Sequence, residues 1–461
     1  MHDIGQTDCH LSSCAHERYY MEASVTDALW NQKPCERGAG MNQKIEAARR
    51  GLEAFMKWLV LSTLTGAITG VVGVGFQKSV VFATSCRTQY PWLLFLLPAG
   101  GVLIVWLYHL FKQPIGLGTD DLFVAIQDEG RLPLSMPPLI FVATFITHLL
   151  GGSAGREGAA LQLGGGIANA LSRFMKLDDH DRDTLTLIGM GSLFSALFGT
   201  PVTAMVFVME VIALGHMIYS SIVPCAIASC TAYGVALILG AQPEAFALAN
   251  VPEFGLVTLI KVTVLGALCA CLSILFCESM HKTHAFMVKR LENPYLRVIA
   301  GGTAIIVLTL LVGTRDYNGA GGDVIERAIE GVARPQDFLL KLVFTAITLS
   351  CGFKGGEIVP TFFVGATFGC MVGPLMGLDP GFAAAVALAA TFCGNTNCPI
   401  AATFLAMELF GGQGMPLFIV ACSVSYMLSG KYSLYNAQRI SFESEKLGKV
   451  VLPRPDRRRN S

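Results

Sequence analysis

The stretch Ser153-Ala-Gly-Arg-Glu-Gly-Ala-Ala-Leu-Gln-Leu-Gly-Gly-Gly166 places Arg156 and Glu157 at a glycine-rich break between two apolar segments. The apolar run after the break, from Ala159 to Ala170, predicts a new helix. The free N–H groups and the positive dipole end of that helix face the break, so Glu157 is an anion tethered at an anion-binding helix start. In a soluble protein such a carboxylate is usually a helix cap. Inside a membrane, an ionisable residue indicates function.

The composition indicates that these flanking segments lie in a membrane. Of the 461 residues, 53% are hydrophobic and 14% are charged, whereas soluble proteins carry about 25% charged residues. The mean hydropathy is +0.55. The net charge is zero and no basic stripe is present, which argues against a nucleic-acid partner. We therefore expect an all-α polytopic protein of the cell membrane that contacts the lipid bilayer and needs no cofactor.

The first residues of the chain, 1–42, are polar and lack periodicity, so they are expected to be a disordered tail. The true start of the protein is one of three methionines, Met1, Met21 or Met41. One group in this tail has metal-like spacing, Cys9, His10, Cys14 and His16. No second paired set accompanies the group, so a zinc site is the less favoured interpretation.

Positive charge near both ends predicts the orientation of the chain. A short amphipathic stretch, residues 42–53, carries Lys44, Arg49 and Arg50 just before the first apolar span. The polar tail at 441–461 ends with several arginines and is also expected to lie outside the membrane. Because cytoplasmic flanks of membrane spans are enriched in Lys and Arg, both termini are expected to be cytoplasmic.

Residues 43–440 form the expected transmembrane domain, in two halves at about 50–240 and 255–430. In the first half, apolar spans are predicted at about 55–84, 92–111, 137–151, 158–173, 184–197, 201–214 and 219–240. In the second half they are predicted at about 256–278, 297–313, 338–352, 361–376, 381–393, 399–411 and 415–429. Several spans are shorter than the roughly 20 residues that a full crossing needs. Short spans separated by Gly or Pro indicate helices that end inside the membrane, around a protein-lined cavity.

The two halves repeat a pair of motifs in the same order. The segment 201–210, Pro-Val-Thr-Ala-Met-Val-Phe-Val-Met-Glu, matches 399–408, Pro-Ile-Ala-Ala-Thr-Phe-Leu-Ala-Met-Glu, 198 residues later. Upstream, Gly-Arg-Glu at 155–157 pairs with Gly-Gly-Glu at 355–357, 200 residues later. Corresponding Gly/Pro-interrupted segments indicate a transporter substrate site, and two helix N-termini that meet would suit an anion. The glutamates that end the longer motif, Glu210 and Glu408, fit a structural role equally well.

These residues resemble the CLC family of chloride channels and anion/proton exchangers, over about residues 50–440. The resemblance rests on four features, Gly-Arg-Glu-Gly at 155–158, the Pro-to-Glu helix at 201–210, Gly-Gly-x-x-x-Pro at 355–360 and Tyr435 in a polar break. It implies an antiparallel (inverted) double repeat of tilted and broken helices, and a homodimer with one pore per subunit. It also implies that a halide anion (chloride or fluoride) and the proton are the transported partners. No paired regulatory CBS domains are expected after the short tail.

The resemblance also assigns roles to residues near the break. It implies that Glu157 is the external gate, which moves between the anion site and a proton path. It implies that the backbone N–H groups of Glu357 and Ile358 hold the central anion, with the hydroxyl of Tyr435 beside it. The other residues expected along the anion pathway are Gly155, Arg156, Gly158 and Leu117.

Several positions depart from the usual family pattern. The usual Gly-Ser-Gly-Ile-Pro is Gly-Leu-Gly-Thr-Asp at 116–120, so the serine hydroxyl is replaced by Leu117. Val211 stands at the position of the usual internal proton glutamate. Val211 and the acid at 357 are similar to the fluoride/proton antiporter branch, although that branch usually has a threonine near position 359. The selectivity candidates are therefore Thr119, Glu357 and Val359, and the choice between chloride and fluoride stays open.

Two alternative functions follow from the same residues. A passive chloride channel of the same family would share the anion path but lack proton coupling, and Val211 weakens a proton path of the usual kind. A membrane hydrolase is suggested by the Gly-x-Ser-x-Gly pattern at 151–155, with Ser153 as nucleophile. That pattern needs a strand before the serine and a histidine and an acid in reach. Here the preceding segment is apolar, is predicted to be helical, and carries only His148.

Overall fold

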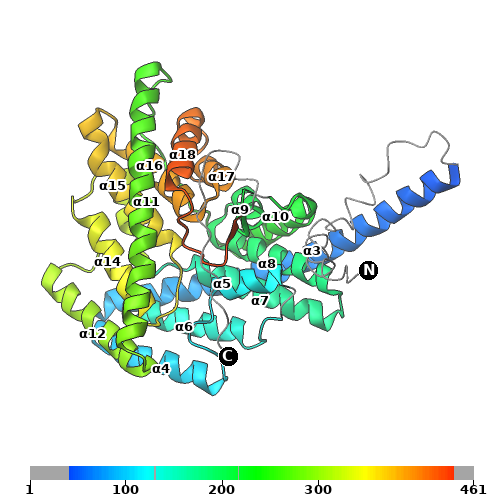
Figure 1. Cartoon of the computed structure of the whole chain (residues 1–461), viewed down its shortest axis with the longest axis horizontal. Helices are drawn as coiled ribbons and strands as arrows, with labels where there is room; N and C mark the ends of the chain where they lie inside the picture. Colours follow the sequence, from blue (N-terminus) through cyan, green and yellow to red (C-terminus); the bar gives the residue numbers. More distant parts are fainter. Residues whose placement is uncertain (1–40, 129–130, 216, 441–461) are drawn as a thin grey trace, which may run out of the picture. The chain divides into compact units, whose positions relative to one another are not determined.

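The computed structural model describes residues 41–128, 131–215 and 217–440, and these residues are mostly helical (Figure 1). The first half contains α3 (Met41–Gln89), η2 (Pro91–Leu96), α4 (Leu97–Leu110), α5 (Thr119–Gln127), α6 (Met136–Leu150), α7 (Glu157–Phe174), α8 (Asp179–Phe198), α9 (Pro201–Glu210), η3 (Tyr219–Ser221) and α10 (Ile222–Ile238). The second half contains α11 (Leu256–Arg290), α12 (Pro294–Val312), α13 (Gly322–Ile329), α14 (Asp337–Ser350), α15 (Ile358–Val372), η4 (Gly373–Met376), α16 (Pro380–Thr396), α17 (Pro399–Phe410) and α18 (Met415–Ser429). The described residues fall into two compact parts, 41–62 and the residues from Thr63 onward, and the packing described below lies within the second part.

Six helices of the described part of the chain are long and apolar enough to cross a membrane. They are 44–89, 91–110, 219–238, 256–290, 294–312 and 358–376. Shorter apolar helices accompany them, and these include α6, α9, α17 and α18. The predicted mixture of full-length and broken apolar helices is therefore confirmed.

The predicted spans differ from the helices in a few places. The stretch at 42–53 is continuous with the first span, in one helix that starts at Met41. The span predicted at 256–278 continues to Arg290, through a polar turn in which Lys282 pairs with Glu278. The span predicted at 201–214 is too long, because α9 ends at Glu210 and residues 213–214 form a short strand. The helices α5 and α13 have 9 and 8 residues, too short to show as apolar spans.

The only sheet of the described residues is a pair of two-residue strands, one in the first half of the domain and one at the last described residues. β1 (Ala213–Leu214) pairs in parallel with β2 (Arg439–Ile440). The strands follow α9 on one side and the segment of Tyr435 on the other. This pairing holds the last described residues against the first half of the domain.

The helices end and restart in the same way at corresponding positions of the two halves. Gly199 is in the left-handed conformation after α8 (φ 71°), and Pro201 is the first residue of α9. In the second half, Asn397 is left-handed after α16 (φ 58°), and Pro399 is the first residue of α17. Left-handed residues end helices, and proline suits the first helical position. The 198-residue repeat therefore reflects one helix break that occurs twice.

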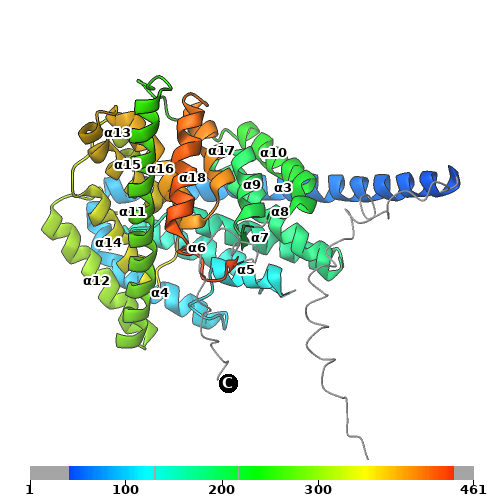
Figure 2. The same ribbon diagram turned by 45° about the horizontal axis from the view of Figure 1, so that its top comes forward.

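In each half, α7 lies beside α8 and α15 beside α16 (Figures 1 and 2), and small residues let these helices pack closely. A Cβ on Gly164 of α7 would lie 2.1 Å from the carbonyl oxygen of Gly189 in α8. A Cβ on Gly369 of α15 would lie 2.3 Å from the carbonyl oxygen of Ala383 in α16. Close backbone contact of this kind is typical of helix packing in membranes. It fixes α7 and α15, the two helices whose N-termini meet at the predicted site.

Candidate functional site

Two backbone hydrogen bonds join the glycine-rich breaks of the two halves. The N–H of Gly155 donates to the carbonyl of Gly356 at 2.7 Å, and the N–H of Gly356 donates back to the carbonyl of Gly155 at 2.8 Å. α7 then begins at Glu157 and α15 at Ile358, so the two helix starts are 358 minus 157, or 201, residues apart. The 200-residue alignment made from the sequence is therefore wrong by one residue. Glu357 occupies the N-cap position that Arg156 has in the first half.

The carboxylate of Glu157 lies across both helix starts. Its side chain has no exposed surface. Oε1 accepts a hydrogen bond from the N–H of Arg156 at 2.8 Å, and Oε2 accepts one from the N–H of Val359 at 3.1 Å. Arg156 is the N-cap of α7 and Val359 is the second residue of α15, so each bond uses a helix-start N–H group that lacks a helical partner. The carboxylate therefore bridges the N-termini of α7 and α15.

The residues next to Glu157 contribute mainly backbone groups, rather than side chains, to the surroundings of its carboxylate. The Arg156 guanidinium forms an ion pair with Glu244 and lies 5.7 Å from the centre of the Phe198 ring. Its charge is therefore neutralised by Glu244, while its N–H serves the Glu157 carboxylate. Gly158 allows close approach, because a Cβ there would lie 3.2 Å from Cα of Gly356. The predicted pathway residues Gly155, Arg156 and Gly158 are thus brought together with the start of α15.

Glu357 is a half-buried acid with acidic neighbours. It is the N-cap of α15, but its side chain forms no cap hydrogen bond. Within residues 41–128, 131–215 and 217–440, its carboxylate accepts no hydrogen bond from any group. The charges of Asp120 and Glu157 are close enough to interact with it. Glu357 is therefore not a structural cap, and its carboxylate is available for another partner.

The first-half loop that contains Leu117 closes the other side of the site. Leu117 is buried, as are Ile358 and Val359 at the start of α15. The hydroxyl of Thr119 accepts a hydrogen bond from the side-chain amide of Gln162 at 3.2 Å. The same hydroxyl is 3.5 Å from the position of a Cβ on Gly158. The loop therefore contacts the first turns of α7 through Thr119, whereas the other two selectivity candidates, Glu357 and Val359, lie at the start of α15.

Tyr435 is held near these acids by contacts that the sequence analysis missed. The Asp120 carboxylate accepts hydrogen bonds from the N–H groups of Asn436 at 3.3 Å and Ala437 at 3.1 Å. The ring of Phe123 packs edge-on against Tyr435, with centroids 5.0 Å apart. Tyr435 is buried and close enough to Glu357, Glu157 and Asp120 to interact electrostatically. Asp120 stands where the family pattern has proline, and that departure was the available signal.

Val211 is fully buried and offers no titratable group at the position of the usual internal proton glutamate. Its carbonyl accepts a hydrogen bond from the side-chain amide of Gln438 at 3.0 Å. The preceding residue, Glu210, accepts hydrogen bonds from the N–H groups of Ile400 and Ala401 instead. Both positions are therefore occupied by structural contacts.

The hydrolase interpretation is not supported by the surroundings of Ser153. The segment before it is the helix α6, not a strand. The Ser153 hydroxyl is 3.0 Å from the hydroxyl of Thr345. Nε2 of His148 is hydrogen-bonded to the carbonyl oxygen of Gly155 at 3.2 Å. The serine and histidine are thus hydrogen-bonded to other groups.

Comparison with known proteins identifies the family. A sequence model of the family described as voltage gated chloride channel matches residues 100–430. The chain belongs to the CLC family. The predicted resemblance is confirmed, and the CLC family consists of membrane transport proteins, as the apolar helices indicate.

Individual CLC relatives match over most of the chain. A chloride/fluoride channel protein from Pseudomonas syringae pv. tomato is 35% identical over 391 residues, which are 83% of this chain and 86% of the relative. A solved CLC-type fluoride/proton antiporter has a TM-score of 0.81 at 31% identity and covers 88% of this chain and 100% of its own. A slow cyanobacterial Cl⁻/H⁺ antiporter has a TM-score of 0.70 at 19% identity, with 81% and 94% covered, and shares the fold. The predicted all-α polytopic CLC fold is therefore confirmed.

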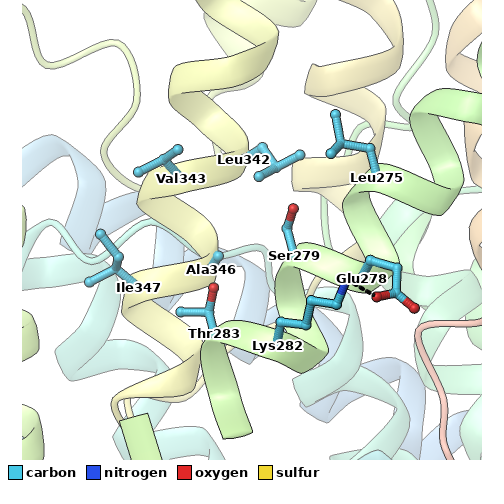
Figure 3. Close-up of a pocket in the computed structure, with 9 residues that line it drawn as sticks. All are labelled: Leu275, Glu278, Ser279, Lys282, Thr283, Leu342, Val343, Ala346 and Ile347. Carbon is cyan, nitrogen blue, oxygen red and sulfur yellow. Dashed lines mark ion pairs between the residues drawn. The ribbon is translucent and has the colours of Figure 1, made fainter. Parts of the chain in front are cut away.

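A groove of about 490 Å³ between α11 and α14 lies apart from the CLC motifs. Apolar side chains such as Leu275, Leu342 and Ile347 form most of its wall, as Figure 3 shows. Its charged part is the ion pair of Lys282 with Glu278, at 2.7 Å. None of the predicted site residues lines this groove.

The group at Cys9, His10, Cys14 and His16 lies outside the described residues.

Proposed function

We propose that the chain moves a halide anion across the membrane in exchange for protons, with Glu157 as gate and proton carrier. The observation behind this proposal is the hydrogen bond from the N–H of Val359 to Oε2 of Glu157 at 3.1 Å. It links the carboxylate of one half to the helix start of the other. An ionised Glu157 fills the site, and a protonated Glu157 loses its attraction and leaves. Anion arrival and proton uptake are therefore coupled at one position.

The energies of the two states of Glu157 are close enough for a switch. An ionised acid at the middle of a membrane helix costs roughly 2.5–3.5 kcal/mol on insertion scales. One helix N-terminus returns at most about 2 kcal/mol in a favourable, partly buried position. Glu157 contacts two such N-termini, so their combined contribution, at most about 4 kcal/mol, is comparable with the cost. The ionised carboxylate is held at rest, and an anion that takes over the same N–H groups releases it.

We propose fluoride before chloride as the transported halide. Leu117 offers no hydroxyl where the family has serine, and Glu357 provides a carboxyl group without a hydrogen-bond partner among the described residues. When protonated, that carboxyl would donate a hydrogen bond, and a small, strongly accepting anion gains most from it. The backbone N–H of Ile358 and the Tyr435 hydroxyl complete the proposed anion site. The relatives described as a chloride/fluoride channel and a fluoride/proton antiporter support this order.

A passive channel remains the second candidate, because one observation favours it. Val211 is buried and cannot carry a proton to the inner side of the membrane. We propose that Glu357 replaces that missing acid, since its carboxylate has no hydrogen-bond partner among the described residues and the charge of Asp120 acts on it. A channel would need neither acid to titrate.

The test is anion efflux from liposomes that contain the purified full-length protein, with fluoride and chloride compared and external pH recorded. Coupled exchange predicts uphill proton movement driven by a halide gradient. Glu157→Ala should stop proton movement and leave an anion leak, while the exposed control Glu326→Ala should behave as the wild type. Halide flux without proton movement in the wild type would establish the passive channel. Absence of halide flux in folded wild-type protein would refute both candidates.

The assembly and orientation are also proposals. We infer a homodimer with one pathway per subunit, as the CLC family resemblance implies, and both termini in the cytoplasm. The positive residues Lys44, Arg49 and Arg50 support this orientation. Light scattering in detergent would give the mass of the assembly, and reaction of a cysteine-free variant with single cysteines near either end would give the orientation. A monomeric mass or an externally reactive end would contradict them.

A further inference from the structure

Lys354 connects the two halves of the site at a position that the transport mechanism above does not use. It lies between α14 and α15, three residues before Glu357. Its ammonium group donates to the carbonyl of Leu117 at 2.9 Å and also to the carbonyl of Ile115. The same group lies 4.8 Å from the centre of the Tyr108 ring. One side chain of the second half thus binds the backbone of the first-half loop that contains Leu117.

Among the described residues, the ammonium group of Lys354 donates hydrogen bonds only to the loop that contains Leu117. No carboxylate of the described residues lies within ion-pair distance of Nζ. Two of its three N–H donors are used on the loop carbonyls, and its charge rests on the aromatic face of Tyr108, which is buried. A cation with this set of partners holds both carbonyl oxygens directed at itself. The loop therefore cannot turn those oxygens toward an anion.

A second contact shows that the loop also packs on the backbone around Lys354. A Cβ built on Gly352 would lie 3.5 Å from Cγ2 of Ile115, and the N–H of Lys354 donates to the hydroxyl of Thr147 at 3.3 Å. Lys354 is thus fixed to α6 through its backbone and to the loop through its side chain. Because it precedes the N-cap of α15, any movement of the loop relative to α15 must break these contacts.

We propose that Lys354 is a positioning residue for halide selectivity, which sets the separation between the Leu117 loop and the N-terminus of α15. The inference rests on the proposed function, because it assumes that an anion passes between these two elements. Fluoride and chloride differ in size, so a site of fixed width can favour one of them. Release of the loop would remove that constraint and bring the two transport rates together. Lys354 itself need not touch the anion.

The test compares Lys354→Met with the wild type in liposomes, as the ratio of fluoride to chloride flux. Methionine keeps an unbranched stem and removes the charge and the donors. We expect the ratio to move toward one by at least about threefold, with flux retained. Lys354→Arg, which keeps a cation for the carbonyls and the ring, should stay near the wild-type ratio. Lys261→Met is the matched control, since Lys261 also donates to a backbone carbonyl, that of Gly377 at 2.9 Å, away from the site.

Each outcome separates this inference from the proposed function. If the wild type and Lys261→Met pass no halide, the proposed function is refuted. If they transport and Lys354→Met keeps their ratio, the positioning role is refuted. If Lys354→Met does not fold, Tyr108→Leu removes only the aromatic support of the ammonium group and should shift the ratio in the same direction. An unchanged ratio in folded Tyr108→Leu would then overturn the inference.

Discussion

Glu210 and Glu408 each cap the helix that carries the other. The Glu210 carboxylate accepts hydrogen bonds from the N–H groups of Ile400 at 3.2 Å and Ala401 at 2.9 Å, in the first turn of α17. The Glu408 carboxylate accepts them from Val202 at 2.9 Å and Thr203 at 2.8 Å, in the first turn of α9. The repeated motif therefore encodes a reciprocal pair of helix caps between the halves. This favours the structural interpretation of the two glutamates.

We predict that Glu408→Gln lowers the free energy of unfolding. The glutamine side chain retains one acceptor oxygen, but its NH2 group faces a backbone N–H donor of α9. At least one backbone N–H group therefore loses its acceptor, at a cost of about 1–3 kcal/mol. Thermal unfolding in detergent measures the change, and Glu210→Gln should have a similar effect. The exposed Glu326→Gln is the control. Equal melting temperatures for all three variants and the wild type would contradict the capping role.

Glu357→Gln should change halide selectivity. The carboxyl of Glu357 has the charges of Asp120 and Glu157 near it and no hydrogen-bond donor from the described residues. Glutamine keeps the shape but cannot exchange a proton with the transported ion. We expect a lower fluoride flux relative to chloride and weaker proton coupling in the liposome assay. The exposed Glu330→Gln serves as control, and unaltered transport of every halide by Glu357→Gln would exclude a role in the pathway.

Gly356→Ala should displace the gate without removing its carboxylate. A Cβ at this position would lie 2.6 Å from Oε2 of Glu157 and 2.5 Å from the N–H nitrogen of Gly158, closer than real Cβ contacts allow. We expect an anion leak with reduced proton coupling, similar to that of Glu157→Ala. Gly322→Ala is a suitable control, because a Cβ there meets nothing within 4 Å. Full coupling in folded Gly356→Ala would show that the carboxylate does not need this position.

Asp120→Asn should weaken anion binding through Tyr435. The Asp120 carboxylate accepts from the N–H groups of Asn436 and Ala437, and an amide can accept only with its oxygen. Loss of about 1 kcal/mol at this contact corresponds to about a fivefold rise in the halide concentration for half-maximal flux. Tyr435→Phe should raise that concentration as well, and the exposed Asp323→Asn should not. A rise in Tyr435→Phe without one in Asp120→Asn would show that Tyr435 is positioned by other contacts.

Much of the fold could be predicted because local residues produce it. Left-handed residues and prolines mark the helix breaks at the same spacing in both halves. The position of Glu157 at the start of a helix could be predicted in the same way, from the glycine-rich break before it. The register of the other break could not be predicted to the residue. Acids at 157 and 357 suggested a spacing of 200, whereas the hydrogen bonds of Gly155 with Gly356 set it at 201.

The contacts that complete the site join residues far apart in the chain, so they produce no local pattern in the amino-acid sequence. Lys354 and Leu117 are 237 residues apart, and Asp120 and Ala437 are 317 apart. Only the folded chain brings them together, so neither periodicity nor a short motif indicates them. Short helices such as α5 and α13 were missed for a related reason. Their residues are too few and too polar to form an apolar span.

The reciprocal caps between the halves have a consequence for how the protein is made. The acceptor for the N–H of Val202 is Glu408, which the ribosome adds 206 residues later. Until then, the start of α9 and the carboxylate of Glu210 lack the partners that they have in the folded protein. Insertion of the first half alone therefore leaves the N-terminal cap of α9 unformed and the Glu210 carboxylate without its acceptor role. Truncation after the first half should yield a polypeptide that membrane proteases degrade.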